Sequence, residues 1–268
     1  MPAIDPYAED LALILEASRE AAEIAMRFFR KDPGVWYKNE GRSPVSEADV
    51  AIDRLLQTTL LAARPDYGWL SEEAEDNELR LSHRRIFVVD PIDGTRAYVA
   101  GRKEWCVSIG IVEDGLPVAG VLVAPALGEI WQASLGTGAF LNGKKLVFDT
   151  SEQGAAPLRV IVPDVVVKHM RPGTDGAVDK VPGGPSLALR LAAVARGDFD
   201  GVYIRPSSNE WDLAAADVML GETGHRLVDL QGARMRYNAP DPSRELMLAA
   251  SEGQLAQLLE PFGPAAGH

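Results

Sequence analysis

The sequence predicts a layered α/β protein, and three observations support that prediction. Segments with apolar residues at helical spacing alternate with short apolar runs along the 268 residues, and no internal repeat is present. Residues 86–89, directly after Arg85, are all apolar, which is typical of a central strand covered on both faces. Hydrophobic residues make up 46% of the chain, enough to form a sizeable core. A largely disordered chain is therefore excluded.

Two helices are expected near the N-terminus. Over residues 7–30, apolar side chains recur every three to four positions, and Lys31-Asp32-Pro33-Gly34 ends the pattern. The second helix is expected over residues 47–64. Ser46 is suited to its N-cap, and Asp49 at the third helical position completes a capping box.

Strands dominate the rest of the first half. Residues 67–70 form a short strand that runs into the acidic pair Glu72-Glu73, and the apolar strand 85–89 ends at Asp90. Strand-like segments separated by glycine turns over residues 106–141 predict an antiparallel meander. The single cysteine, Cys106, excludes an intramolecular disulfide and a cysteine-based zinc site, and its apolar flanks predict a buried strand thiol.

A shift in composition at residues 150–157 marks the expected boundary between two subdomains, 1–153 and 154–268. The elements expected beyond it are a strand at 159–162, a polar loop at 163–185, a helix at 186–196, a strand at 201–204, a helix at 211–220 and a strand at 225–228. Long loops in compact domains are often functional, so the 163–185 loop is a candidate substrate loop.

The charge of the chain limits its partners. There are 27 Lys and Arg against 39 Asp and Glu, a net charge of −12. An acidic surface repels nucleic-acid polymers and anionic lipid, so neither is expected as a partner. The N-terminus lacks the basic start and apolar run of a signal peptide, and no stretch approaches the ~20 apolar residues of a membrane span. We therefore expect a cytoplasmic protein.

The stretch Asp90-Pro91-Ile92-Asp93-Gly94-Thr95 places two carboxylates three residues apart at the end of a buried strand. Pro91 fixes φ and Gly94 permits unusual backbone angles, so a tight turn can present Asp90, the Ile92 carbonyl and Asp93 to one point. Such oxygen ligands suit Mg²⁺. The alternative is an acidic turn in which Asp93 caps a helix. Two further acidic sites, at Glu72-Glu73 and in the first turn of the 211–220 helix, favour the metal.

Four motifs together carry a family resemblance, in the family's order and spacing: Ser43-Pro44-Val45-Ser46-Glu47-Ala48-Asp49, Leu70-Ser71-Glu72-Glu73, Asp90-Pro91-Ile92-Asp93-Gly94-Thr95 and Trp211-Asp212-Leu213-Ala214-Ala215. The chain resembles the inositol monophosphatase-like phosphatases, a Mg²⁺-dependent, lithium-sensitive superfamily. The resemblance implies an α/β (α+β) fold, specifically a layered α-β-α-β-α sandwich. The 1–153 subdomain would carry most metal ligands, and 154–268 the substrate loop and Asp212. A homodimer is the family's usual state.

The resemblance also implies roles for individual residues. Glu72, Asp90 and the Ile92 carbonyl would hold one Mg²⁺, and Asp90, Asp93 and Asp212 a second, with two or three ions in all. The implied catalytic residues are Asp49, Thr95 and Glu72, of which Asp49 and Thr95 polarise the attacking water. The residues implied to contact substrate are Gly94, Thr95, Ser186, Arg190 and Asp212. The reaction would be hydrolysis of a small phosphorylated metabolite without a phosphoenzyme.

The substrate is less strongly indicated than the metal site. Leu70-Ser71 before the acidic pair and a cation at Arg190 favour a 3′(2′),5′-bisphosphate nucleotidase, which converts adenosine 3′,5′-bisphosphate to AMP and phosphate. Inositol 1-phosphate is the alternative, followed by histidinol phosphate. Pro185 and Gly221-Glu222-Thr223-Gly224 depart from the family's pattern. A hypothesis from another class is a catalytically idle protein that binds phosphate or ions on the same scaffold.

Two further motifs match other families incompletely. Residues 138–145 begin like a phosphate-binding P-loop but lack its final Ser or Thr, and Asn142-Gly143 is better interpreted as a type I′ hairpin turn. The Asp90–Asp93 spacing is one residue too long for the nucleophile loop of haloacid dehalogenase-like phosphatases. The four histidines show no metal-ligand spacing, and each is expected on the surface or in a loop.

Overall fold

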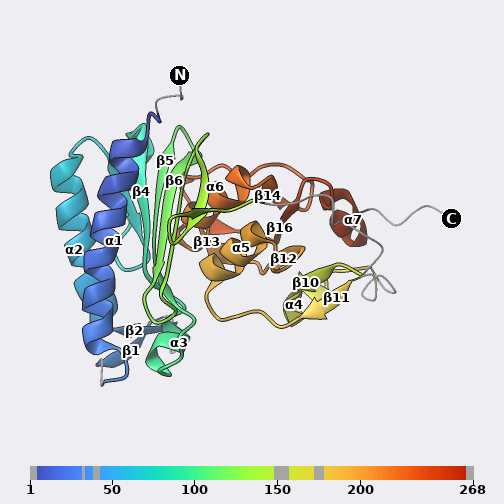
Figure 1. The fold of residues 1–268 in the computed structure, drawn as a ribbon, viewed down its shortest axis with the longest axis horizontal. Helices are drawn as coiled ribbons and strands as arrows, with labels where there is room; N and C mark the ends of the chain where they lie inside the picture. The colour runs from blue at the N-terminus through green and yellow to red at the C-terminus, as the bar shows by residue number, and fades with distance from the viewer. Residues whose placement is uncertain (1–4, 32–33, 39–42, 148–156, 172–177, 264–268) are drawn as a thin grey trace.

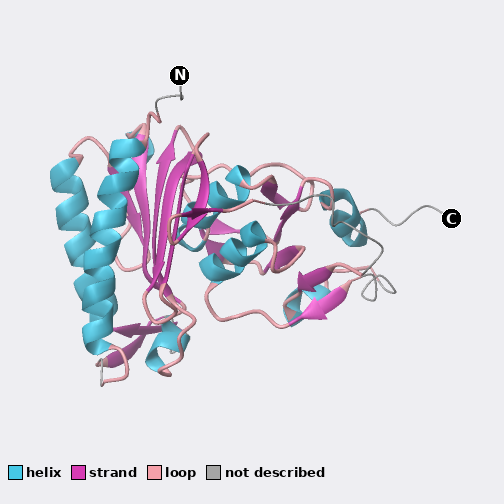
Figure 2. Cartoon of the chain, viewed as in Figure 1, coloured by secondary structure: helices cyan, strands magenta, loops and turns pink. Residues whose placement is uncertain are grey.

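Layers of helices and sheets alternate across the molecule in the order α-β-α-β-α (Figures 1 and 2). This computed structural model describes residues 5–31, 34–38, 43–147, 157–171 and 178–263. The expected subdomain boundary, at 153/154, lies outside the described residues. The expected layered fold is confirmed.

The outermost layer consists of α1 (Ala8–Phe28) and α2 (Glu47–Ala63), which cover one face of the large sheet (Figure 1). Both helices match the expected ranges to within two residues. Apolar side chains from the two helices, such as Ile14 and Leu56, pack with Phe87 and Val121 of the sheet. Asp49 accepts hydrogen bonds from the Ser46 N–H at 2.8 Å and the Ser46 hydroxyl at 2.6 Å, so the expected cap at this helix start is present.

The large sheet has seven strands in sequence order: β3 (Gly68–Ser71), β4 (Arg85–Asp93), β5 (Cys106–Glu113), β6 (Leu116–Ala124), β7 (Glu129–Ser134), β8 (Gly138–Leu141) and β9 (Lys144–Lys145). β3 and β4 are parallel, and all later neighbours are antiparallel, as the expected meander requires. Cys106 is fully buried in β5, as predicted. Asn142 and Gly143 have φ of 50° and 75° in the β8–β9 turn, which confirms the hairpin and excludes the P-loop.

The second sheet has the strand order β11 (Asp179–Val181), β10 (Arg159–Ile161), β12 (Gly201–Ile204), β16 (Met247–Ser251) and β14 (His225–Asp229). Its first three strands are parallel, and β16 is antiparallel to both neighbours. Helices α5 (Leu187–Arg196) and α6 (Ala214–Glu222) lie between the two sheets, and α4 (Asp164–Val167) and α7 (Leu255–Leu259) cover the far face (Figure 1).

Two facing glycines set the distance between α6 and the large sheet. Gly110 of β5 and Gly120 of β6 are directly paired in the ladder. A Cβ on Gly110 would lie 2.9 Å from the Ala214 Cβ, and a Cβ on Gly120 would overlap the Ala215 carbonyl oxygen. The first turn of α6 therefore rests on bare backbone, which fixes the place of Asp212 just before it.

Several expectations need correction. β4 continues past Asp90 to Asp93, and the 163–185 loop contains both α4 and β11. The 211–220 helix begins as a 3₁₀ turn, Glu210–Asp212, before α6 starts. His225 is a buried strand residue at 1% exposure instead of a surface residue, because β14 packs on α6 and β16.

The remaining elements were not predicted. They are the hairpin β1 (Val35–Lys38) and β2 (Ser43–Ser46), the two-stranded ladder β13 (Ser208–Asn209) and β15 (Ser243–Arg244), the interior strand β16 and α7, and the 3₁₀ turns Glu78–Ser82 and Glu260–Phe262. The short helix α3 (Thr95–Val99) lies directly after Asp93 and Gly94, where the acidic-turn alternative placed a helix. Among the described residues, none of the helices is both long and apolar enough to cross a bilayer.

Candidate active site

The end of β4 forms the first part of the site. The β4–β5 register shifts between Asp90 and Asp93, so the strand bulges there. Asp90 Oδ1 accepts the Ile92 N–H at 2.9 Å, and the Ile92 carbonyl accepts the Thr95 hydroxyl at 3.0 Å. Gly94 follows with φ of 94°, a conformation that favours glycine, and α3 starts at Thr95. These contacts turn the chain sharply and point both aspartates to the same side.

Asp93 joins the large sheet to the start of α5. Its Oδ2 accepts the Ser186 hydroxyl and, at 2.7 Å, the Ala188 N–H, while its Oδ1 accepts the Leu187 N–H at 3.2 Å. The carboxylate thereby satisfies N–H groups that the first turn of a helix leaves without partners. Asp93 thus caps α5, which begins more than 90 residues later, and it also faces the other acids. The alternative in which Asp93 caps the helix that directly follows it was wrong, because the N-cap of α3 is Gly94 and no side chain caps that helix.

Asp212 reaches the same place from the opposite side. It ends the 3₁₀ turn Glu210–Asp212, and its Oδ2 accepts the Asn209 N–H at 2.8 Å. Glu210, fully buried, accepts the Asn238 N–H at 2.7 Å and the Ala239 N–H at 3.1 Å, and pairs with Arg244. The turn that carries Asp212 is therefore tied to the loop before β15.

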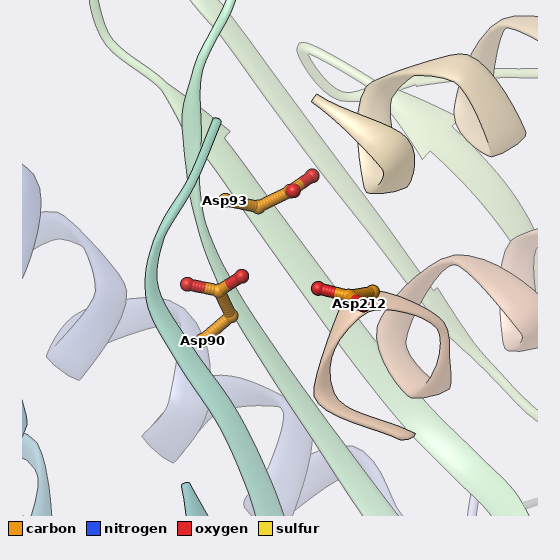
Figure 3. A group of neighbouring side chains, drawn as sticks. All are labelled: Asp90, Asp93 and Asp212. Carbon is orange, nitrogen blue, oxygen red and sulfur yellow. The ribbon is translucent and has the colours of Figure 1, made fainter. Parts of the chain in front are cut away.

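Figure 3 shows Asp212 facing Asp90 and Asp93 across a small gap. One carboxylate oxygen from each of the three lies within 4.8 Å of the others. These are the three residues that the sequence resemblance assigns to one ion. The three derive from two segments more than 100 residues apart, and the bulge, the α5 cap and the Glu210 contacts are what bring them together.

Glu72 and Asp49 border this cluster without joining it. Glu72 directly follows β3, and its N–H donates to the Val89 carbonyl at 3.2 Å, which places it beside the end of β4. Its carboxylate interacts electrostatically with Asp90 and Asp212. Asp49 is near enough for its charge to raise the pKa of both Glu72 and Asp90.

The acids destabilise one another's charged forms. Burial, and then the neighbouring Glu72, raises the pKa of Asp90 well above its ordinary value. Burial followed by Asp212 raises the pKa of Glu72, and burial followed by Asp93 raises that of Asp212. Burial also raises the pKa of Asp49 to about 6, although its bonds to Ser46 act in the opposite direction. Negative charge is thus concentrated beyond what nearby side chains neutralise.

This donor set fits a hard divalent cation. Carboxylate oxygens, with the Ile92 carbonyl beside them, are the ligands that Mg²⁺ prefers. A cation would also relieve the repulsion that raises these pKa values. The Ile92 carbonyl already accepts the Thr95 hydroxyl, and a carbonyl oxygen has a second lone pair for a metal.

The residues expected to contact substrate differ in burial and in the partners of their side chains. Gly94 and Thr95 are half-buried at the edge of the cluster. Ser186 is 1% exposed, and its hydroxyl donates to Asp93 and accepts the Leu189 N–H at 3.1 Å. These bonds turn the Ser186 hydroxyl toward Asp93, so Ser186 positions that carboxylate, and its contact with substrate stays a prediction.

Arg190 lies one turn into α5, half-buried, with its Nε 3.3 Å from the Ser186 carbonyl. Burial lowers its pKa, Asp93 acts to raise it, and a second arginine, Arg205, acts to lower it again. Arg205 also acts on Asp212. Arg205 is not among the site residues expected from the sequence. Its position directly after the 201–204 strand is the signal that could have indicated it, since residues at strand ends often line sites in α/β proteins.

Comparisons with known proteins extend over most of the chain. The model of the Inositol monophosphatase family matches residues 7–261. A histidinol-phosphatase of Mycobacterium tuberculosis is 34% identical over 243 residues, 84% of this chain and 88% of that protein. An inositol monophosphatase 2 of Solanum lycopersicum is 31% identical over 242 residues, 86% of this chain and 91% of that protein.

A 3′(2′),5′-bisphosphate nucleotidase CysQ of Aggregatibacter actinomycetemcomitans is 31% identical over 244 residues, 84% of this chain and 86% of that protein. Among solved structures, the extragenic suppressor protein suhB from Bartonella henselae superposes with a TM-score of 0.80 at 24% identity, and the match covers 96% of this chain and 99% of that one. That structural likeness supports the fold. The relatives differ in the substrates that their names give.

Proposed function

The chain belongs to the inositol monophosphatase family of phosphatases, and from this premise we propose a Mg²⁺-dependent phosphomonoesterase that converts adenosine 3′,5′-bisphosphate to AMP and phosphate. The observation that carries the proposal is the convergence of Asp90, Asp93 and Asp212 within 4.8 Å beside a half-buried cation, Arg190. The acids suit a metal that a phosphate can approach, and the cation suits a substrate with a second anionic group.

We assign the ligands as two sets that share Asp90. Glu72, Asp90 and the Ile92 carbonyl would hold one Mg²⁺, and Asp90, Asp93 and Asp212 would hold another. Bound Mg²⁺ supplies the Lewis acidity that makes water nucleophilic at neutral pH and offsets the charge of the phosphate. Ser186 and the α5 amides hold Asp93 in place through its side-chain oxygens.

Thr95 and Asp49 would orient the attacking water. The Thr95 hydroxyl gives its proton to the Ile92 carbonyl at 3.0 Å, so its oxygen can accept a hydrogen bond from water. Asp49 is fixed at the start of α2 by Ser46 and can accept a second water proton. With both protons held, the water oxygen would direct a lone pair at phosphorus for in-line attack.

Substrate recognition would involve Gly94 and Thr95 beside the reacting phosphate and Arg190 beside the rest of the molecule. Asp212 would contact the departing alcohol as well as the metal. We also infer that the 1–153 segment supplies Glu72, Asp90 and Asp93, that 154–268 supplies Asp212 and the substrate loop, and that the protein acts as a homodimer.

The experiment is phosphate release from four compounds at saturating Mg²⁺, with and without lithium: adenosine 3′,5′-bisphosphate, inositol 1-phosphate, histidinol phosphate and fructose 1,6-bisphosphate. We expect the nucleotide to be preferred and lithium to inhibit. Preference for inositol 1-phosphate or histidinol phosphate would retain the phosphatase and reject the substrate assignment. Saturable ligand binding with no phosphate release from any of the four would favour an idle binding protein.

A further inference from the structure

Arg205 and Arg190 approach the acidic cluster from two different elements. Arg205 directly follows β12, and Arg190 lies in the first turns of α5, which packs on β12. The two guanidinium groups interact electrostatically with each other, and each acts on Asp212. Two cations from separate elements thus border the acids on one side, where a substrate held by its reacting phosphate would extend.

The fold holds the side chain of Arg190 and the backbone around Arg205. The aliphatic stem of Arg190 lies over Gly183, where an added Cβ would be 2.9 Å from the Arg190 Cδ. The backbone around Arg205 is fixed by two bonds: the Arg205 carbonyl accepts the Ser208 hydroxyl at 3.1 Å, and the Ser207 N–H donates to the Arg244 carbonyl at 2.7 Å. Binding an anion there would therefore require little ordering of the backbone.

Two positive charges that repel each other beside one site are expected to have a ligand that neutralises them. Within the described part of the chain, the half-buried Arg190 forms no ion pair with a carboxylate, whereas other buried or half-buried arginines do, as Arg80 does with Asp76 and Arg244 with Glu210. The exposed Arg205 forms no such pair with any described carboxylate either. Arg205 itself is exposed, so its donors are available to a ligand. A group that bridges the two cations would have to be anionic and of phosphate or carboxylate geometry.

We propose that Arg190 and Arg205 together form a subsite for the second, non-reacting phosphate of the substrate. This inference rests on the proposed function, in which the reacting phosphate lies at Asp90, Asp93 and Asp212. The subsite discriminates by charge. It favours a bisphosphate, because both arginines can pair with a second phosphate. The neutral hydroxyls of inositol 1-phosphate gain no such ion pair, and the ammonium group of histidinol phosphate is repelled.

The test compares two substrates that differ in one phosphate. Adenosine 3′,5′-bisphosphate and adenosine 3′-monophosphate carry the same reacting monoester, and only the first carries the 5′-phosphate. We expect Arg205→Ala to lower kcat/KM for the bisphosphate about 10- to 100-fold, the range of a charge-assisted hydrogen bond, and for the monophosphate less than about threefold. Arg205→Lys should recover part of the loss, because it restores charge without the bidentate geometry.

Lys144→Ala serves as the matched control, since it removes one exposed positive charge from the distant strand β9. It should change neither kcat/KM. An equal loss on both nucleotides in Arg205→Ala, or no loss on either, would overturn the subsite while the phosphatase activity of the wild type stands. A wild type that hydrolyses inositol 1-phosphate and neither nucleotide would overturn the substrate assignment and the subsite together.

Discussion

The close approach of α6 to Gly120 makes a sharp steric prediction. A Cβ at this position would overlap the Ala215 carbonyl oxygen and lie 2.8 Å from the Ala215 Cα, both backbone atoms that cannot rotate away. Gly120→Ala must therefore push α6 off the sheet. Overpacking of this kind costs about 1–3 kcal/mol, which lowers the Tm by about 3–10 °C for a chain of this length.

The displacement should also reach the active site, because Asp212 stands two residues before α6 begins. A shift of about 1 Å in a catalytic group costs up to ~100-fold in rate, so we expect a comparable loss of kcat. Gly221→Ala is the control on the same helix: nothing lies within 4 Å of its added Cβ, and replacing a helical glycine should stabilise by about 0.5–1 kcal/mol. If Gly120→Ala retained the wild-type Tm and rate, the reasoning about this contact would be refuted.

Three further predictions concern charge. Asp212→Asn should raise the Tm in the presence of a chelator, since it removes repulsion among buried acids, and should abolish the Tm increase that Mg²⁺ gives the wild type; a lower Tm in chelator would contradict this. Glu210→Gln removes the negative charge that pairs with Arg244 and should raise the Mg²⁺ concentration for half-maximal rate about 10-fold, as measured by Mg²⁺ titration. Burial lowers the pKa of His225 to about 4, so the folded state favours the neutral imidazole. The stability gained from keeping this imidazole neutral is fully present above pH ~6.5 and is lost as the pH falls toward 4. Between pH 7 and 5 the wild type should lose about 2 kcal/mol more unfolding free energy than His225→Gln, measured by denaturant titration.

Much of the candidate site could be predicted from the sequence because its chemistry is local. The turn from Asp90 to Thr95 needs a proline, a glycine and two acids at fixed positions, and these residues are contiguous. Asp212 was recognisable from the motif around it. The contacts that could not be predicted depend on how elements far apart in the sequence pack together. Ser186 turns toward Asp93 because α5 starts beside β4, and Arg205 interacts with Arg190 because β12 packs on α5.

The fold was predictable where apolar patterns are long. Both N-terminal helices and the meander have such patterns. Strand β16, Met247–Ser251, was missed although strands pair with it on both sides. The sequence Met-Leu-Ala-Ala-Ser suits a helix as well as a strand, and only its pairing with β12 and β14 makes it a strand. The β1–β2 hairpin was missed because Pro44 and its polar neighbours resemble a loop, and a two-stranded ladder tolerates proline at its edge.

The most direct test of the central claim is the rate of Mg²⁺-dependent phosphate release from adenosine 3′,5′-bisphosphate by purified wild type and Asp90→Asn. The substitution keeps the size of the side chain and removes the charge that both proposed ligand sets share. The account predicts a folded variant whose rate is lower by several orders of magnitude at saturating Mg²⁺. A variant that keeps near-normal activity would contradict the assignment of this cluster as the metal-binding active site.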